Sequence, residues 1–235
     1  MFSVMFEVAP AADQWDAYLA YAKRLRPELE TIDGFVDNIR YRSLTREGWL
    51  LSLSGWRDEK ALVRWRAKAS HHEVQQKGRG GVLHDYHLRV GQITADTQIP
   101  AGHVIREQRL DETEVGDGKT IVLLDGKRPP DWVAGRDAQA VASALGLRTD
   151  AEGLLGWDSF DAVLSPGDVI ALSTWQDDAA VRRFLSQGIP DEVRCRTVRV
   201  IRDYGMFDRR EAPQYYPQVE RRQGGMVRGT SERPM

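Results

Sequence analysis

The stretch of this chain with the highest density of chemically capable side chains lies between residues 65 and 79. Two adjacent histidines, His71 and His72, follow Trp65 and precede Gln76 and Arg79. A neutral imidazole, whose ordinary pKa is about 6.5, can take a proton from a phenol or bind iron through one ring nitrogen. A guanidinium group can hold a carboxylate through two parallel hydrogen bonds. The segment is therefore the predicted chemical site.

If this segment is helical, residues four apart share a face, so His72 lies with Gln76 and His71 with Gln75. One of the two imidazoles can then face inward. We expect His72 to be the general base, with Trp65 as the wall that holds a flat substrate. The alternative is structural: each histidine is solvated or caps a helix end, and Trp65 belongs to the core.

Three further residues are expected to bind substrate together with Gln76. Glu7 alternates with apolar residues along the first predicted strand, Arg79 can anchor an acid, and Tyr86 lies on a later strand. The alternative for Arg79 is a solvated charge near a helix end. Tyr86 and His87 lie on opposite faces of their strand, as do His84 and His87, so this stretch does not predict a metal site.

The elements that position these residues occur twice. Residues 50–59, which read as a strand, a tryptophan and the start of a helix, return 119 positions later as residues 169–178. Upstream, Gly34 is matched with Gly156. A repeat of this length at one offset indicates two copies of one fold. The second copy lacks most of residues 71–81, so we expect the first copy to carry the function.

Periodicity and turn residues predict the order β-α-β-β-α-β in each copy. This is the ferredoxin-like arrangement, in which helices cover one face of an antiparallel sheet and leave the other face open. An open apolar face requires a partner, so the two sheets are expected to pack against each other. The predicted elements of the first copy are residues 1–8, 13–30, 35–44, 49–56, 58 to 78–81 and 84–93, and those of the second are 119–124, 131–146, a hairpin within 155–175, 177–187 and 193–201.

The resulting class is α+β, with one unit over residues 1–95, a divergent second unit over 103–207 and a polar, flexible tail over 208–235. Residues 226–235 are expected to be disordered because the tail is rich in polar residues, proline and glycine. Tyr215, Tyr216 and Pro217 interrupt this composition. The paired rings either dock on the folded body or belong to the flexible tail, and the sequence leaves both readings open.

Composition excludes several classes of function. The chain has 235 residues, of which 41% are hydrophobic and 29% charged, and a net charge of −2. This balance does not indicate a nucleic-acid partner or an anionic membrane surface. A single cysteine, Cys195, excludes an intramolecular disulfide framework. No apolar run reaches the roughly 18 residues of a membrane span, and residues 1–8 read as a strand rather than a signal peptide, so we expect a cytoplasmic protein.

Common cofactor motifs are also missing from the sequence. It has no dinucleotide-binding glycine pattern, no phosphate-binding loop, no nucleophile elbow and no paired cysteines. Residues 116–119 read as a turn. No metal or flavin is expected, and heme is the one alternative that the histidines leave open.

The first half of the chain resembles the antibiotic biosynthesis monooxygenase superfamily. The resemblance covers residues 1–95 and rests on these segments: Phe6-Glu7-Val8, 25–29, Gly34-Phe35, 51–54, 56–59, Trp65-Arg66, His71-His72, Gly78-Arg79 and 88–90. It implies a dimeric α/β-barrel, here made from two fused units, whose second unit completes the barrel in place of a second subunit. It leaves open whether the fused chain is a monomer or forms a homodimer.

The family includes cofactor-independent oxygenases of electron-rich aromatic rings and Isd-type heme-degrading monooxygenases. The first function expected from the resemblance is oxygenation of a small aromatic or quinol-like substrate by dioxygen, without metal or flavin. The heme-degrading members carry an asparagine near the position of Glu7, and this chain lacks it. Heme binding through His71 or His72 is the second expectation, and a non-catalytic module for a small molecule or protein partner is the third.

Overall fold

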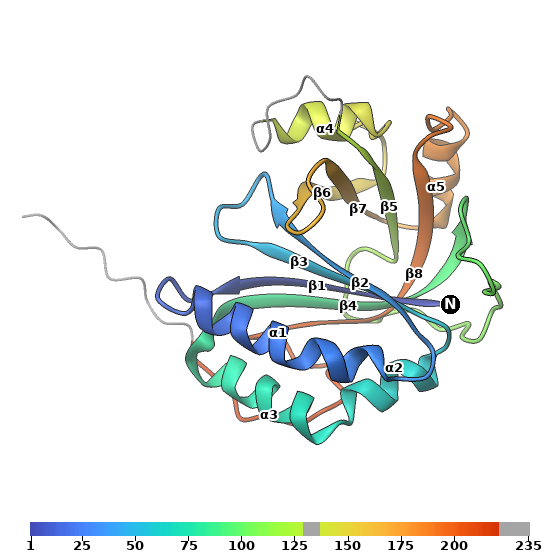
Figure 1. Cartoon of the computed structure of the whole chain (residues 1–235). Coiled ribbons are helices and arrows are strands. Elements are labelled where there is room, and N and C mark those ends of the chain that lie inside the picture. Colours follow the sequence, from blue (N-terminus) through green and yellow to red (C-terminus); the bar gives the residue numbers. More distant parts are fainter. Residues whose placement is uncertain (129–136, 221–235) are drawn as a thin grey trace, which may run out of the picture.

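Eight antiparallel strands close into a single barrel in the computed structural model, which describes residues 1–128 and 137–220 (Figure 1). Around the barrel the strands follow the order β1 (Phe2–Pro10), β3 (Leu50–Trp56), β2 (Phe35–Ser43), β6 (Leu154–Ala162), β7 (Asp168–Trp175), β5 (Thr120–Lys127), β8 (Arg194–Gly205) and β4 (Leu83–Asp96). The first four strands in the chain come from one ferredoxin-like unit and the last four from the other. The predicted α+β class and the order of elements are confirmed.

The first unit contains four strands, three helices and a π-helical turn, η1, which lies between the third helix and the fourth strand. The first helix begins at Trp15 with Gln14 as its N-cap, whereas the sequence predicts Asp13, one residue earlier, as that cap. The predicted single helix after Asp58 is two helices separated at residues 67–68. The elements are β1 (Phe2–Pro10), α1 (Trp15–Glu30), β2 (Phe35–Ser43), β3 (Leu50–Trp56), α2 (Glu59–Arg66), α3 (Ala69–Lys77), η1 (Gly78–Val82) and β4 (Leu83–Asp96).

The second unit repeats this order with one helix in place of the α2–α3 pair. The helix predicted over 131–146 is described as α4, and residues 131–136 of that prediction lie outside the described residues. The elements are β5 (Thr120–Lys127), α4 (Ala138–Ala144), β6 (Leu154–Ala162), β7 (Asp168–Trp175), α5 (Asp178–Leu185) and β8 (Arg194–Gly205).

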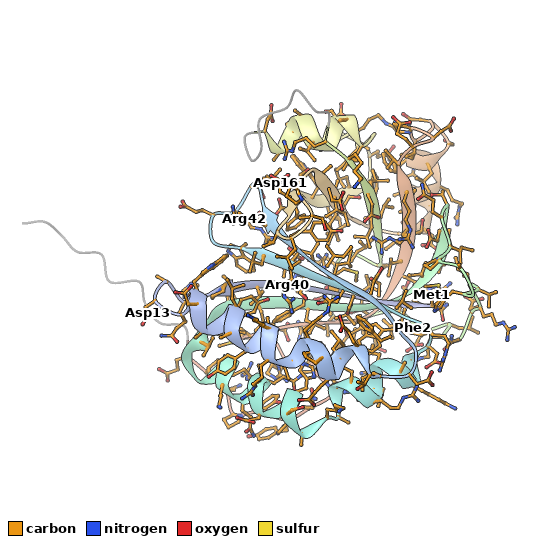
Figure 2. All side chains as sticks on the ribbon, in the orientation of Figure 1. Met1, Phe2, Asp13, Arg40, Arg42 and Asp161 are labelled. Carbon is orange, nitrogen blue, oxygen red and sulfur yellow. The ribbon has the colours of Figure 1, made fainter. Side chains whose placement is uncertain are left out.

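Hydrogen bonds join the two sheets at both edges. A long seam runs between β4 and β8, and a short one joins β2 to β6, where Arg42 pairs in register with Asp161 (Figure 2). Closing a sheet in this way leaves no unpaired edge for another chain to extend. The barrel interior is filled by apolar side chains from both units: Met1, Met5, Tyr41, Leu51, Leu53, Ile93, Ile121, Leu123, Phe160, Ile170, Leu172, Val198 and Val200.

The helices form two layers on the outside of the barrel. α1, α2 and α3 cover the strands of the first unit, and α4 and α5 cover those of the second (Figure 1). Because side chains alternate along a strand, Met5 enters the barrel whereas Phe2 packs under the helices. The first unit therefore has a second apolar layer between its strands and helices, and this layer positions the site described below.

The strand-to-helix junctions of the two units have the same side-chain contacts. The indole Nε1 of Trp56 donates to Ser54 Oγ at 2.9 Å, and that of Trp175 donates to Ser173 Oγ at 2.9 Å. Both indoles are buried, so each polar N–H needs a partner. The serine two residues earlier on the same face of the strand supplies it, which explains the repeated Ser-x-Trp pattern.

The helices after these strands also begin in the same way. Asp58 accepts a hydrogen bond from the backbone N–H of Ala61 at 2.8 Å, and Asp177 accepts one from Ala180 at 2.8 Å. Each aspartate is an N-cap that satisfies an otherwise unpaired amide of the first turn. Aspartate is a favoured N-cap residue, so the sequence alone predicts a helix start at Asp58, and the structure confirms it.

The glycine that precedes the second strand of each unit corrects one detail of the sequence comparison. Gly34 has a φ of +90°, and its counterpart is Gly153 with a φ of +84°, not Gly156. A Cβ on Gly34 would lie 2.7 Å from the Cβ of Ala61, and one on Gly153 would lie 2.5 Å from that of Ala180. Gly34 and Gly153 are equivalent in backbone conformation and in close packing. Alignment of apolar residues in the sequence does not detect either property.

We expect Gly34→Ala to reduce the free energy of unfolding by about 2–3 kcal/mol, because it combines a left-handed backbone with a steric clash. Gly48→Ala is the matched control, since Gly48 has a φ of +76° and no atom within 4 Å of the added methyl group. It should cost only the backbone term of about 1–2 kcal/mol. Urea denaturation measures both, and equal losses would show that the contact with Ala61 adds nothing.

No helix within residues 1–128 and 137–220 is both long and apolar enough to cross a membrane.

Candidate active site

A cavity of about 230 Å³ lies between the outer face of the first unit's strands, its helices and the segment that follows β8. It is smaller than the roughly 300–1,000 Å³ of pockets for drug-sized ligands, so it suits a small molecule. Apolar and aromatic side chains form most of its wall. They include Val4, Phe6, Tyr18, Leu25, Leu62, Trp65, Val74, Leu88 and Val90.

Trp65 and His71 form one aromatic wall of this cavity. Trp65 lies in the last turn of α2 and His71 in the first turn of α3. The break between these helices lets the rings stack with centroids 4.4 Å apart and planes at 17°. The ring Nδ1 of His71 lies 3.2 Å from the backbone oxygen of Trp65. A carbonyl oxygen only accepts, so Nδ1 carries the proton and Nε2 keeps the free lone pair.

Burial, together with the nearby His72, lowers the pKa of His71 to about 4, although the hydrogen bond to the backbone of Trp65 acts in the opposite direction. The imidazole is therefore neutral throughout the neutral pH range. Its Nε2 is always available as an acceptor, although it is a weak base at equilibrium.

His72, the residue expected to face inward, does not line this cavity. Its Nδ1 lies 3.1 Å from the hydroxyl of Tyr216, and its Nε2 lies 3.1 Å from the amide nitrogen of Gln76. Gln76 is exposed and also lies outside the cavity wall, whereas His71 and Gln75 line it. The predicted pairing of faces holds, but α3 presents the other face to the cavity.

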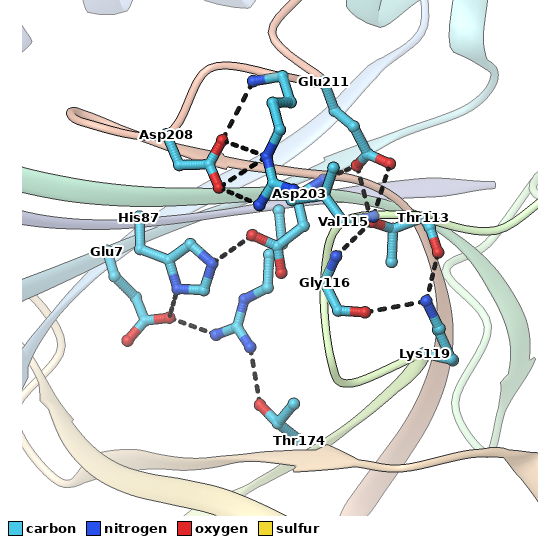
Figure 3. Close-up of polar contacts among 12 residues, drawn as sticks. Glu7, His87, Thr113, Val115, Gly116, Lys119, Thr174, Asp203, Asp208 and Glu211 are labelled. Atoms are coloured by element: carbon cyan, nitrogen blue, oxygen red, sulfur yellow. Dashed lines mark hydrogen bonds and ion pairs between the residues drawn. The ribbon is translucent and has the colours of Figure 1, made fainter.

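Glu7 also lies away from the cavity, because its side chain points into the barrel from β1. It forms ion pairs with Arg89, which is buried, and with Arg46, and the ring of His87 lies between Glu7 and Asp203 (Figure 3). Burial alone would raise the pKa of Glu7, but the two arginines outweigh it and lower the pKa. The geometry gives Glu7 a structural role at one end of the barrel.

Arg79 and Tyr86 are brought together at the cavity wall. Arg79 is 7% exposed and its Nη1 donates to the Tyr86 hydroxyl at 3.1 Å and to the backbone oxygen of Met206 at 3.0 Å. Its Nη2 donates to the backbone oxygen of Pro217 at 3.1 Å. Arg79 is thus buried by the segment after β8, in contrast to the solvated charge that the sequence left as an alternative.

The sequence did not point to several residues of the cavity wall. Asn38 on β2 is buried and its amide oxygen has no hydrogen-bond partner among the described residues. Arg209 and Tyr216 come from the predicted tail, and of the paired tyrosines only Tyr216 docks, while Tyr215 is 90% exposed. The paired rings were the one signal that this segment contacts the body of the protein.

Metal ligands are not gathered anywhere in the described part of the chain: no group of three or more His, Cys, Asp or Glu side chains could hold an ion there. Cys195 is buried, and burial raises the pKa of its thiol to about 11. The thiol is therefore not poised as a nucleophile.

The fold and cavity together define a protein in which two ferredoxin-like units close one barrel and the first unit carries a small ligand pocket. The family model for antibiotic biosynthesis monooxygenase matches residues 1–77, which hold most of the cavity wall. A curated relative from Pyricularia oryzae, "Jasmonate monooxygenase ABM", is 51% identical over 228 residues, covering 92% of this chain and 99% of the relative. The chain belongs to the antibiotic biosynthesis monooxygenase family.

Solved structures with a similar fold include two aldoxime dehydratases. One matches with a TM-score of 0.54 and 12% sequence identity over 85% of this chain and 81% of its own. The other, a complex with butyraldoxime, matches with a TM-score of 0.53 and 12% identity over 85% and 79%. At this level of identity the likeness describes the fold alone.

Proposed function

We propose that this protein is a monooxygenase that oxygenates a small, mostly apolar substrate in the cavity of its first unit, with jasmonate as the leading candidate. The observation that carries the proposal is the partly buried apolar cavity beside a histidine whose Nε2 lone pair is free. The choice of substrate is supported by the near full-length match to the relative named as a jasmonate monooxygenase.

Jasmonate suits the chemistry of the cavity wall. It is a cyclopentanone that carries an apolar pentenyl chain and an acetic acid group, so most of its surface can be buried against Phe6, Leu25 and Leu62. The Trp65–His71 wall offers a flat surface for a ring. The same wall suits the electron-rich aromatic substrate expected from the sequence, which makes that class the comparison substrate.

Monooxygenation places one atom of dioxygen in the substrate and reduces the other to water. An activated ring CH₂ that becomes C=O supplies all the electrons itself, so no further reductant is needed. Hydroxylation of an unactivated carbon needs two electrons and two protons from an external reductant, such as a reduced nicotinamide or flavin. For an electron-rich aromatic substrate, the proposed reaction follows the first course and needs only dioxygen. For a saturated carbon of jasmonate, it follows the second course and needs the external reductant.

His71 is proposed to act in place of His72, because only His71 lines the cavity. Its Nε2 accepts a hydrogen bond or, transiently, a proton from the substrate atom that reacts. The surrounding apolar wall excludes water from the reduced oxygen intermediate.

Oxygen consumption by the purified full-length chain tests the proposal. Jasmonic acid and anthrone would each be supplied with labelled dioxygen, with and without reduced nicotinamide and flavin, and the products weighed by mass spectrometry. We expect one labelled oxygen atom in the jasmonic acid product, with protein-dependent turnover. Absence of label in both products, under every reductant condition, would contradict the proposed activity.

Heme is the second candidate, because His71 Nε2 is also suited to bind iron as an axial ligand. When bound, heme would supply dioxygen activation. A porphyrin is larger than drug-sized ligands, and the cavity of about 230 Å³ is small for it. Titration with hemin decides: a saturable Soret band that His71→Ala abolishes would favour this candidate over the first.

A further inference from the structure

The cavity of the first unit is lined by many more cationic than anionic side chains. Glu59 is the one acidic residue of its wall, and it is already paired with Arg109 at 2.8 Å. Among the described residues, most of the wall's arginines have no carboxylate within ion-pair distance. The wall contains Arg26, which pairs with Glu30, and Arg40, Arg66, Arg79, Arg202 and Arg209, which have no such pair.

Two of these guanidinium groups converge on one point. Nη1 of Arg79 and Nη1 of Arg209 both donate to the hydroxyl oxygen of Tyr86, at 3.1 and 2.5 Å. Their Cζ atoms lie 5.5 and 5.1 Å from the ring centre of Tyr216. Among the residues that the structure describes, the partners of the two cations are neutral: a hydroxyl, backbone oxygens, a thioether and aromatic rings.

Acidic residues close to this pair in the sequence are committed elsewhere. Asp208 pairs with Arg210 at 2.5 Å. Glu211 accepts hydrogen bonds from Thr113 and from three backbone amides. Two like charges held together without a counter-charge repel each other, and burial of Arg79 strengthens this effect. Among the described residues, neither Arg79 nor Arg209 has a negatively charged partner.

We propose that Arg79 and Arg209 form a carboxylate-binding subsite for the acid group of the substrate, with the segment after β8 as the element that completes it. This inference takes one element from the proposed function, namely that a small molecule binds in this cavity. A planar guanidinium binds a carboxylate through two parallel hydrogen bonds, and two of them can bind both oxygens. The apolar wall then receives the remainder of the molecule.

Binding of acids and their neutral esters to the full-length chain tests this subsite without turnover. Calorimetry would compare jasmonic acid with methyl jasmonate, and phenylacetic acid with its methyl ester. We expect the wild-type chain to bind each acid at least about tenfold more tightly than its ester, because the neutral ester cannot form the charge-assisted hydrogen bonds that the carboxylate forms with the arginines. Failure of both acids to bind, or equal binding of acid and ester, would overturn the subsite.

Variants separate recognition from support of the fold. Arg209→Gln should weaken acid binding about tenfold and leave ester binding within about twofold, and Arg209→Lys should retain part of the preference. Arg79→Gln should act in the same direction. If Arg79→Gln does not fold, Arg209→Gln decides, because Arg209 is only half-buried. The control is Arg182→Gln on α5, an exposed arginine outside the cavity, which should keep the preference unchanged.

Equal losses of acid and ester binding in Arg209→Gln would mean that Arg209 only supports the wall, and would overturn the subsite. The proposed activity can fail separately from it. An arginine-dependent acid preference without incorporation of labelled oxygen supports the subsite and contradicts the monooxygenase. Labelled product from acid and ester with equal specificity constants, together with equal binding, supports the monooxygenase and contradicts the subsite.

Discussion

Replacing His71 with alanine should lower the rate of substrate oxygenation at least about 100-fold, because general-base groups contribute that much or more to catalysis. The substitution removes the imidazole of the one histidine in the cavity wall among the described residues, whose Nδ1 is bound to the Trp65 carbonyl and whose Nε2 keeps its lone pair. His71→Phe separates chemistry from shape, since it keeps a ring to stack on Trp65 and removes both nitrogens. Steady-state oxygen uptake, with thermal unfolding as a check on folding, measures the effect.

His72→Ala is the informative comparison. His72 contacts Tyr216 rather than the cavity, so we expect its loss to have a much smaller effect on turnover than the loss of His71. The opposite ranking would restore the assignment made from the sequence and contradict the role of His71.

The pH dependence of the specificity constant gives an independent readout of His71. Its pKa lies at about 4, below the ordinary 6.5, so the neutral ring required for catalysis is lost only as the pH falls through about 4. We therefore expect no inflection from His71 between pH 5.5 and 8. An inflection near 6.5 that disappears in His71→Phe would show that the cavity does not bury the ring as described.

Replacing Glu7 with glutamine should lower the free energy of unfolding by about 3–5 kcal/mol, the range for breaking a buried ion pair by removing one partner. Glu7 and Arg89 are each 5% exposed, and the substitution leaves the buried guanidinium without its carboxylate. Urea denaturation at neutral pH measures the loss. Glu73→Gln is the matched control, because Glu73 pairs with Lys77 on the exposed surface of α3 and should change stability little.

The effect of Glu7→Gln should shrink in acid. The pKa of Glu7 is lowered in the folded protein, so the stability that its charge contributes is present above its ordinary value of 4.5 and is lost as the pH falls through the folded value. Wild type and variant should therefore converge in stability below pH 4.5. A difference that is constant from neutral to strongly acid pH would mean that shape, rather than charge, explains the loss.

The order of elements in both units could be predicted because each depends on local patterns. Alternation of apolar residues predicts the strands, three- and four-residue spacing predicts α1, and Asp58 predicts the start of α2. Helix ends and helix breaks are less local. The break at residues 67–68 brings Trp65 of α2 against His71 of α3, and this contact is formed only in the folded chain.

The assignment of faces could not be obtained in the same way. Along α3, His71 and His72 are equally good candidates to face inward, and the helix has no buried residue of its own that would set its rotation. The stacking of His71 on Trp65 and the docking of Tyr216 on His72 decide it. The same limit applies to Glu7. Alternation places it on one face of β1, but it does not predict that Arg46 and Arg89 form ion pairs with it there.

By itself the sequence determined the α+β class and the order of the elements, because composition, periodicity and caps act over a few neighbouring residues. It also predicted the segment that is proposed to carry the chemistry. Only the tertiary structure decided which strands join the two sheets, β4 to β8 and β2 to β6, that His71 rather than His72 lines the cavity, and that Arg209 meets Arg79 at Tyr86. These outcomes depend on contacts between residues far apart in the chain. Such contacts have no signature in local spacing, because they arise from the packing of complete elements.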